Sequence, residues 1–358
     1  MTSGSLMTIT QIAKWAKVSK STVSRVLNNS AAVRPEVAEK VRAAMKAHNY
    51  APPAVKRGPK PKLKGLLQSN TTIGVLLYGR TRELLQFPAM VKMMSGIVET
   101  LNAVDLSPSI IEMPDPLFIP KAISAGNLGG LIILGSQNSK ESANRLHPLP
   151  CVFVGGMESD FPIADHVLPN SRLIVSLAAD YLIRCGCKHP ALINHDFLHP
   201  ALAQRALLFS DYLTRHGVEP LQFVSHKSKS KGDEGSMWSP ARLRAGFEKL
   251  IDEMLAAPVR PDGLFIPTDQ QAAMVWTILK ERGIKPGKDI ITISCNNDEA
   301  WLATMHPRPA TIDVRSEEIG RESALRMLAH IRNPQDSPVV SLVTPRLIPG
   351  EEECLRGK

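Results

Sequence analysis

The sequence lacks the features of membrane and secreted proteins. No stretch approaches the roughly 18 uninterrupted apolar residues that a bilayer-spanning helix requires. The five cysteines are an odd number spread over 358 residues, and the polar start MTSGS lacks the basic and apolar regions of a secretory signal. With 43% hydrophobic and 22% charged residues, the composition also excludes disorder. We therefore expect a cytoplasmic, globular chain of two or three domains.

Common catalytic and cofactor-binding motifs are missing as well. No G-x-G-x-x-G follows an expected strand, no G-x-S-x-G is present, and the run from Gly283 to Lys288 is one residue short of a phosphate loop. Five possible metal ligands lie close together: Cys185, Cys187, His189, His195 and His199. Their C-x-C-x-H spacing matches no common zinc pattern. We expect no metal, no cofactor and no enzyme activity.

Basic residues are concentrated at the N-terminus. Residues 1–65 contain thirteen Lys or Arg and two acidic residues, a net charge of +11, which leaves −2 for the rest of the chain out of a total of +9. A basic segment attached to a near-neutral body indicates that the segment binds a polyanion and that the body has a different role. The alternative is a solvated basic face without a partner.

Residues 8–49 carry the spacing of three short helices. Thr8 to Gln11 form a capping box, Ser19 is placed to cap a second helix, and Pro35 suits the first turn of a third. In the second helix Val23 and Val26 face inward and leave a polar strip on the other side: Lys20, Ser21, Ser24 and Arg25. Two short helices across a tight turn, the second with such a strip, are typical of a helix-turn-helix whose second helix enters the major groove.

The same segment resembles the DNA-binding domain of a known family. The run TITQIAKWAKVSKSTVSRVLN from Thr8 to Asn28, with VRAAM at residues 41–45 and NY at residues 49–50, is similar to the lactose/galactose repressor (LacI/GalR) family. The resemblance implies that three residues read base edges: Lys20, Ser21 and Arg25. It implies phosphate contacts for five others: Thr8, Ser19, Thr22, Ser24 and Asn28. The alternative for Thr22 and Ser24 is solvation or a bond to the preceding turn.

Two residues of this segment carry more specific expectations. Arg25 is the only arginine of its helix, and its planar fork suits a bidentate contact with guanine. Lys17 stands where the family usually has a turn glycine, and a non-glycine residue at positive φ costs about 1 kcal/mol. We expect this cost to weaken the turn without changing the fold.

Residues 51–71 form a basic, proline-rich connector that departs from the family. The family has a hinge helix here whose leucine inserts into the minor groove, but Pro59 and Pro61 each cost about 3 kcal/mol inside a helix. We expect an extended stretch that places four basic residues along a narrow A·T-rich minor groove: Lys56, Arg57, Lys60 and Lys62. The alternatives are a linker that contacts nothing and a shortened helix that inserts Leu66 or Leu67.

The remaining chain alternates short apolar runs with longer segments of helical spacing. The expected strands lie at residues 73–79, 108–113, 130–135, 151–155, 191–194, 263–267 and 290–294. Strands that alternate with helices form parallel sheets, and ligands bind beyond the carboxyl ends of such strands. Two groups of strands therefore indicate two α/β lobes with a cleft between them.

Four segments of this body, residues 268–273, 283–297, 306–313 and 318–325, resemble the effector-binding core of the same family. The resemblance covers nearly the whole chain and implies a dimerising, two-lobed core like a type I periplasmic binding protein. Residues 1–50 would then be the helix-turn-helix domain and residues 72–358 the core. The resemblance implies that the chain passes between the lobes near residues 167–172, 313 and 335. Lobe 1 would then contain about residues 72–168 and 313–335. Lobe 2 would contain about residues 169–312 and 336–358.

The resemblance also places effector-binding candidates. Arg205 corresponds to an arginine that clamps ligand hydroxyls or carboxylates, and Asn296 stands where the family most often has an acidic residue. Five further candidates are Trp238, Thr268, Asp269, Tyr78 and Phe87. Alternatives remain open: the arginine can be a surface cation, the aromatic residues can be core residues, and the Thr-Asp pair can cap the following helix.

Together these features predict a transcription regulator. We expect a sequence-specific DNA-binding protein, a repressor rather than an activator, whose affinity for double-stranded operator DNA is controlled by a small sugar-like ligand between the lobes. It would be associated with the nucleoid when bound to operator, and it would have no membrane partner. The alternative is a cytoplasmic sugar-phosphate or nucleotide enzyme with a basic DNA-binding appendage.

Overall fold

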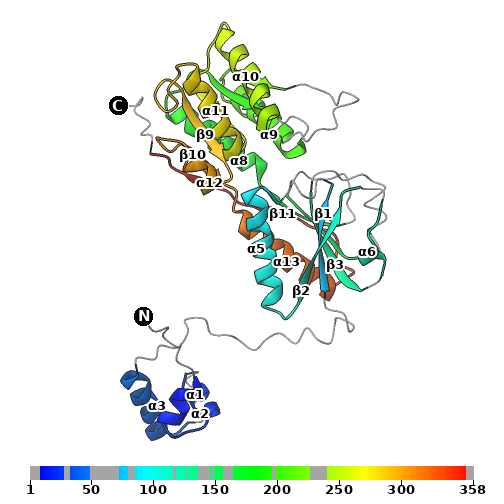
Figure 1. The fold of residues 1–358 in the computed structure, drawn as a ribbon, viewed down its shortest axis with the longest axis vertical. Coiled ribbons are helices and arrows are strands. Elements are labelled where there is room, and N and C mark those ends of the chain that lie inside the picture. The colour runs from blue at the N-terminus through cyan, green and yellow to red at the C-terminus, as the bar shows by residue number, and fades with distance from the viewer. Residues whose placement is uncertain are drawn as a thin grey trace. The chain divides into compact units, whose positions relative to one another are not determined.

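The structure is a computed structural model that describes most of the chain. The described residues are 9–27, 33–48, 72–79, 85–115, 118–125, 127–135, 146, 149–155, 164–195, 199–225 and 240–351. The chain divides into two compact units, Met1–Pro61 and Lys62–Lys358. Figure 1 shows the first as a small helical unit and the second as a larger α/β unit. Among the helices of the described residues, none has the length and hydropathy needed to cross a membrane.

The first unit contains three helices: α1 (Ile9–Trp15), α2 (Lys20–Leu27) and α3 (Pro35–Ala47). Their apolar faces meet in one core: Ile12, Ala13, Ala16, Val23, Val26 and Val41. Ser19 caps α2 as predicted, because its Oγ accepts a hydrogen bond from the backbone N–H of Thr22 at 3.1 Å. Pro35 occupies the first turn of α3. Lys17, between α1 and α2, has a φ of 51°, the left-handed conformation that favours glycine.

The second unit contains two six-stranded sheets. The first has the strand order β11-β5-β4-β3-β1-β2, and all its strands are parallel. Its strands are β1 (Thr72–Tyr78), β2 (Ser107–Met113), β3 (Leu128–Leu134), β4 (Cys151–Val154), β5 (Asp165–Pro169) and β11 (Val340–Val343).

Helices cover both faces of the first sheet. On one face α5 (Pro88–Asn102) and α13 (Ser316–Arg332) lie side by side, and the short α6 (Lys121–Ser124) lies on the other (Figure 1). Gly96 and Gly320 permit the close approach of α5 and α13, because a Cβ at either position would collide with a backbone oxygen of the other helix. This packing fixes the position of α5, whose first turns follow the carboxyl end of β1.

The second sheet has the strand order β12-β10-β9-β8-β6-β7 and is parallel except for β12, which runs antiparallel to β10. Its strands are β6 (Pro190–Asn194), β7 (Leu221–Val224), β8 (Gly263–Phe265), β9 (Ile291–Cys295), β10 (Ala310–Asp313) and β12 (Arg346–Ile348). One face is covered by α8 (Ser171–Arg184) and α9 (Pro200–Arg215), the other by α10 (Pro240–Ala256) and α11 (Asp269–Glu281). The short α12 (Glu299–Leu302) follows β9.

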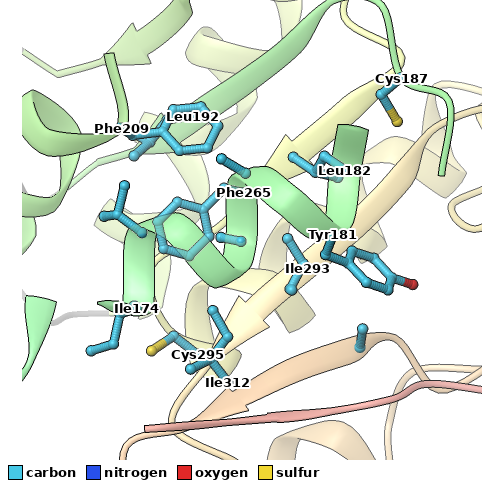
Figure 2. Close-up of a cluster of buried hydrophobic side chains, with 14 of the residues drawn as sticks. Ile174, Tyr181, Leu182, Cys187, Leu192, Phe209, Phe265, Ile293, Cys295 and Ile312 are labelled. Atoms are coloured by element: carbon cyan, nitrogen blue, oxygen red, sulfur yellow. The ribbon is translucent and has the colours of Figure 1, made fainter. Parts of the chain in front are cut away.

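The core between the second sheet and its α8 and α9 helices fixes where the strands end. Figure 2 shows its side chains, which include Ile174, Tyr181, Leu182, Phe209, Phe265, Ile293, Cys295 and Ile312. The rings of Phe209 and Phe265 lie 5.5 Å apart and join α9 to β8. Cys295, the last residue of β9, is completely buried in the same cluster. The carboxyl ends of β8 and β9 are therefore rigidly anchored.

The predicted fold class is confirmed, but one crossing between the sheets lies later than predicted. The chain passes from one sheet to the other after β5 and again after β10. Because β11 pairs with β5, residues 340–343 belong to the first lobe and not to the second, so the last crossing falls between β11 and β12 rather than near 335. The buried carboxylate of Asp165 explains this placement, since it accepts the backbone N–H of Val339 at 2.7 Å.

Candidate functional site

The α2 helix presents a polar face in the first unit. Val23 and Val26 are buried, whereas four residues of α2 are exposed: Lys20, Ser21, Ser24 and Arg25. The Ser19 hydroxyl bonds the hydroxyls of Ser21 and Thr22, at 2.7 and 2.8 Å. The face therefore combines hydroxyls and two cations, groups that suit phosphate oxygens and base edges.

Seven of the predicted site residues lie outside the described residues: Thr8, Asn28, Lys56, Arg57, Lys60, Lys62 and Trp238. The connector, residues 51–71, belongs to the same part of the chain. The roles predicted for these residues remain predictions.

In the second unit, Arg205 of α9 lies at the carboxyl ends of β8 and β9. Its side chain is buried, with the residue 5% exposed, so the alternative of a surface cation does not apply. Its Nη1 donates to the carbonyl oxygen of Pro267 at 3.1 Å and to the Sγ of Cys295 at 3.6 Å. Its Nε is buried without a hydrogen-bond partner. Within the described residues, no carboxylate forms an ion pair with this guanidinium group.

Asp269, the first residue of α11, joins β9, β10 and the loop after β9. It is completely buried, and one carboxylate oxygen accepts hydrogen bonds from the hydroxyls of Ser294 and Thr311. The other oxygen accepts the backbone N–H of Asp298 at 2.7 Å. Burial raises the pKa of Asp269 to about 7, against the lowering effect of these bonds. Because it is buried and protein donors occupy both oxygens, the carboxyl group supports the loop after β9.

The loop after β9 joins the two lobes. Asn296 and Asn297 have positive φ angles of 113° and 56°, a region that asparagine tolerates better than most residues. The Asn296 side chain bonds the carboxyl of Asp298, and Lys92 on α5 donates to the carbonyl oxygen of Asn297 at 2.8 Å. Lys92 also donates to the Asp298 carboxylate at 3.3 Å. Burial raises the pKa of Asp298, and Lys92 and Asn296 counteract this shift.

We call Pro267 and residues 295–298, with the Arg205 guanidinium that contacts them, the carboxyl edge of the second sheet. The charges of Arg205, Asp269 and Asp298 all act on the thiol of Cys295, whose pKa burial raises to about 12. The structure therefore brings together three of the predicted effector residues: Arg205, Asn296 and Asp269.

The other described candidates have different surroundings. Thr268 caps α11, because its Oγ1 accepts the backbone N–H of Gln271 at 3.2 Å. Tyr78 is 3% exposed and belongs to the core between the first sheet and α6, which corresponds to the core alternative. Phe87 is half-buried and directly precedes α5.

Sequence reasoning missed Lys92 and Asp298 at this edge, and Gln271 on α11. Lys92 and Asp298 meet across 206 positions, a separation for which local spacing gives no signal. Gln271, in the first turn of α11, is 2% exposed, and neither its amide nitrogen nor its oxygen has a hydrogen-bond partner. A glutamine at an inward position of an otherwise apolar helical face is a signal that the sequence does contain.

Known proteins provide an independent comparison. Residues 8–53 match the family model of the bacterial regulatory proteins, lacI family, and residues 179–351 match that of the periplasmic binding protein-like domain. The chain carries the DNA-binding domain of the LacI family. This domain, followed by a periplasmic binding protein-like domain, makes the protein a DNA-binding transcription regulator and not an enzyme.

Similar proteins match this regulator over nearly its whole length. Catabolite control protein A of Staphylococcus xylosus is 25% identical, over 96% of this chain and 97% of its own. The structure of the transcriptional regulator CelR in complex with cellobiose has a TM-score of 0.66 at 18% identity and covers 97% of this chain and 100% of its own. The structure of the lac repressor dimer bound to operator and the anti-inducer ONPF has a TM-score of 0.65 at 21% identity. It covers 97% of this chain and 99% of its own. These solved structures share the fold.

Proposed function

We propose that this regulator is a homodimeric repressor whose operator affinity changes when a small polar, sugar-like effector binds between its two lobes. The similar lac repressor structure is a dimer bound to operator, and the similar CelR structure is bound to cellobiose. Those ligands belong to the relatives and support the class of partner, not its identity. A two-fold dimer would read two half-sites of a palindromic operator, at the nucleoid in the cytoplasm.

The exposed face of α2 carries the DNA-binding half of the proposal. Lys20, Ser21 and Arg25 would reach base edges, because they lie on the side of the helix away from the buried valines. Ser19, Thr22 and Ser24, with Thr8 and Asn28 outside the described residues, would hold phosphates and so fix the register of α2 on the duplex.

The connector would add a minor-groove contact. Its four basic residues, Lys56, Arg57, Lys60 and Lys62, alternate with two prolines that oppose a helix. An extended basic stretch matches the negative potential of a narrow, A·T-rich minor groove.

The buried guanidinium of Arg205 carries the effector half. A ligand that contacts Arg205 and Asn296 would touch the same loop that Lys92 joins to the first lobe. Binding there would change the relative free energies of two lobe arrangements, which is the requirement for a signal to reach DNA. Thr268, Phe87 and Trp238 remain candidates for further contacts.

The test uses the full chain. An operator is selected from random duplexes, ligands are found by their effect on the thermal midpoint, and operator affinity is measured with and without each ligand. Arg205→Ala should abolish the effector response while operator Kd stays within about threefold. The control is Arg215→Ala, which removes an exposed cation of the same helix that pairs with Asp211 and should leave the response unchanged. An undiminished response in Arg205→Ala would contradict the proposal.

A further inference from the structure

One edge of the Arg205 guanidinium group has no protein partner. Nη1 makes both of its hydrogen bonds, to Pro267 and Cys295, and these hold the plane of the group in place. Nε is buried and unbonded, and Nη2 makes no hydrogen bond within the described residues. The Nε–H and Nη2–H bonds of an arginine point in parallel from the same edge. Two parallel donors match the two oxygens of a carboxylate or phosphate.

The two acidic groups that, like Arg205, act on the Cys295 thiol are already engaged elsewhere. Both oxygens of Asp269 accept protein hydrogen bonds, and its pKa of about 7 leaves it partly protonated at neutral pH. Asp298 is paired with Lys92 and bonded by the Asn296 side chain. Arg205 is therefore a buried cation without a counter-ion in the described part of the chain. Such a charge is costly to bury, and the binding of an anion offsets the cost.

We propose that the effector is an anion, a sugar acid or a sugar phosphate, whose carboxylate or phosphate oxygens bind the Nε and Nη2 edge of Arg205. The inference rests on the proposed effector site and adds the charge of the ligand. Neutral hydroxyl groups also accept hydrogen bonds from a guanidinium, but they leave its charge unpaired. An anion of similar shape therefore binds more tightly than the neutral sugar. The half-buried amide of Asn296 adds no charge that would repel it.

Matched neutral and anionic sugars test the proposal by calorimetry on the full chain. The probes are D-glucose, D-glucuronate and D-glucose 6-phosphate, with the corresponding galactose and mannose series. We expect at least one anionic probe to bind at least about tenfold more tightly than its neutral parent sugar. Comparison of the carboxylate probes with the phosphate probes identifies which group is recognised. Tighter binding of a neutral sugar, or binding of no anionic probe, overturns the proposal. If that neutral sugar shifts operator affinity, the proposed function survives.

Variants of Arg205 provide a second, independent readout. Arg205→Gln should weaken the anionic probe about tenfold or more, and Arg205→Lys should weaken it less, because lysine keeps the charge and loses the fork. The control Arg215→Gln should leave anion affinity unchanged. Removing an unpaired buried charge should also leave the thermal midpoint of the ligand-free protein equal or higher. A lower midpoint together with unchanged anion affinity would assign Arg205 a purely structural role.

Discussion

Lys92 and Asp298 form an ion pair between the two lobes, with 3.3 Å between Lys92 Nζ and Asp298 Oδ1. The same ammonium group donates to the carbonyl oxygen of Asn297 at 2.8 Å. These bonds attach the second turn of α5 to the loop that also carries Asn296. A ligand that moves this loop would therefore act directly on the first lobe.

Replacing Lys92 with Met should lower the free energy of unfolding by about 1 kcal/mol, because the lysine is partly exposed. The loss should be larger at pH 8 than at pH 5. Without the ammonium the pKa of Asp298, already raised by burial, rises further, and a raised folded-state pKa lowers stability as the pH increases. Urea unfolding at the two pH values measures the effect. The control is Lys249→Met, which breaks an exposed pair with Glu253. Equal losses of stability in both variants would argue against a specific stabilising role of the Lys92–Asp298 ion pair.

Asp269→Asn tests the role of the buried carboxyl group. Because the folded-state pKa is raised to about 7, the wild-type protein should lose stability as the pH rises from about 4 to about 7, by up to about 1.4 kcal/mol per pH unit, and then level off. The asparagine does not titrate and turns a donor toward the N–H of Asp298, so it should cost about 1–3 kcal/mol at low pH and less at pH 8. Parallel stability curves for the two proteins between pH 5 and 8 would rule out this account.

Lys17→Gly should stabilise the first unit by about 1 kcal/mol, because glycine adopts the observed φ of 51° without a Cβ penalty. Hydrogen exchange of the α1 and α2 amides in the full chain measures the change. Lys14→Gly is the matched control, since Lys14 is exposed within α1 and its replacement should destabilise the helix by about 1 kcal/mol. Equal destabilisation by both substitutions would contradict strain at Lys17.

The connector prediction concerns the salt dependence of DNA binding. Replacing Lys56, Arg57, Lys60 and Lys62 with Ala should reduce affinity most for operators with A·T-rich centres. The slope of log affinity against log salt should flatten by about 0.9 for each lost phosphate contact. A control with Lys188, Lys249, Lys285 and Lys288 replaced, all exposed in the second unit, should keep the slope. If the slope and the affinity of the connector variant are unchanged, the connector is a linker that contacts nothing, and the minor-groove prediction is wrong.

The fold was largely predictable because most strands are continuous apolar runs. β5 escaped that pattern, since it begins with the polar residues Asp165 and His166, both buried. Asp165 is accommodated through an ion pair with Arg326 at 3.1 Å and the Val339 N–H, contacts that depend on the tertiary fold. The short β11 and β12 carry too few residues for a periodic signal.

The candidate site was predictable in part, and mainly through the family resemblance. The resemblance identified Arg205 and Asn296 as candidate effector-binding residues. The rule that ligands bind beyond the carboxyl ends of parallel strands predicted at which edge of the sheet such residues lie. The partners of Arg205, Pro267 and Cys295, follow from how α9 packs on β8 and β9, a relation that sequence spacing does not contain. Local pattern likewise has no access to the contact of Lys92 with Asp298, which depends on the arrangement of the two lobes.

Whether α2 reads a specific operator is tested most directly by the affinity of Arg25→Ala for the selected operator and for random duplex DNA, both at one fixed salt concentration. Because a good bidentate base contact discriminates by about 1–3 kcal/mol, operator affinity should fall roughly 5- to 150-fold, while random-sequence affinity changes far less. Equal loss on operator and random DNA would mean that Arg25 contacts only phosphates and would contradict the account.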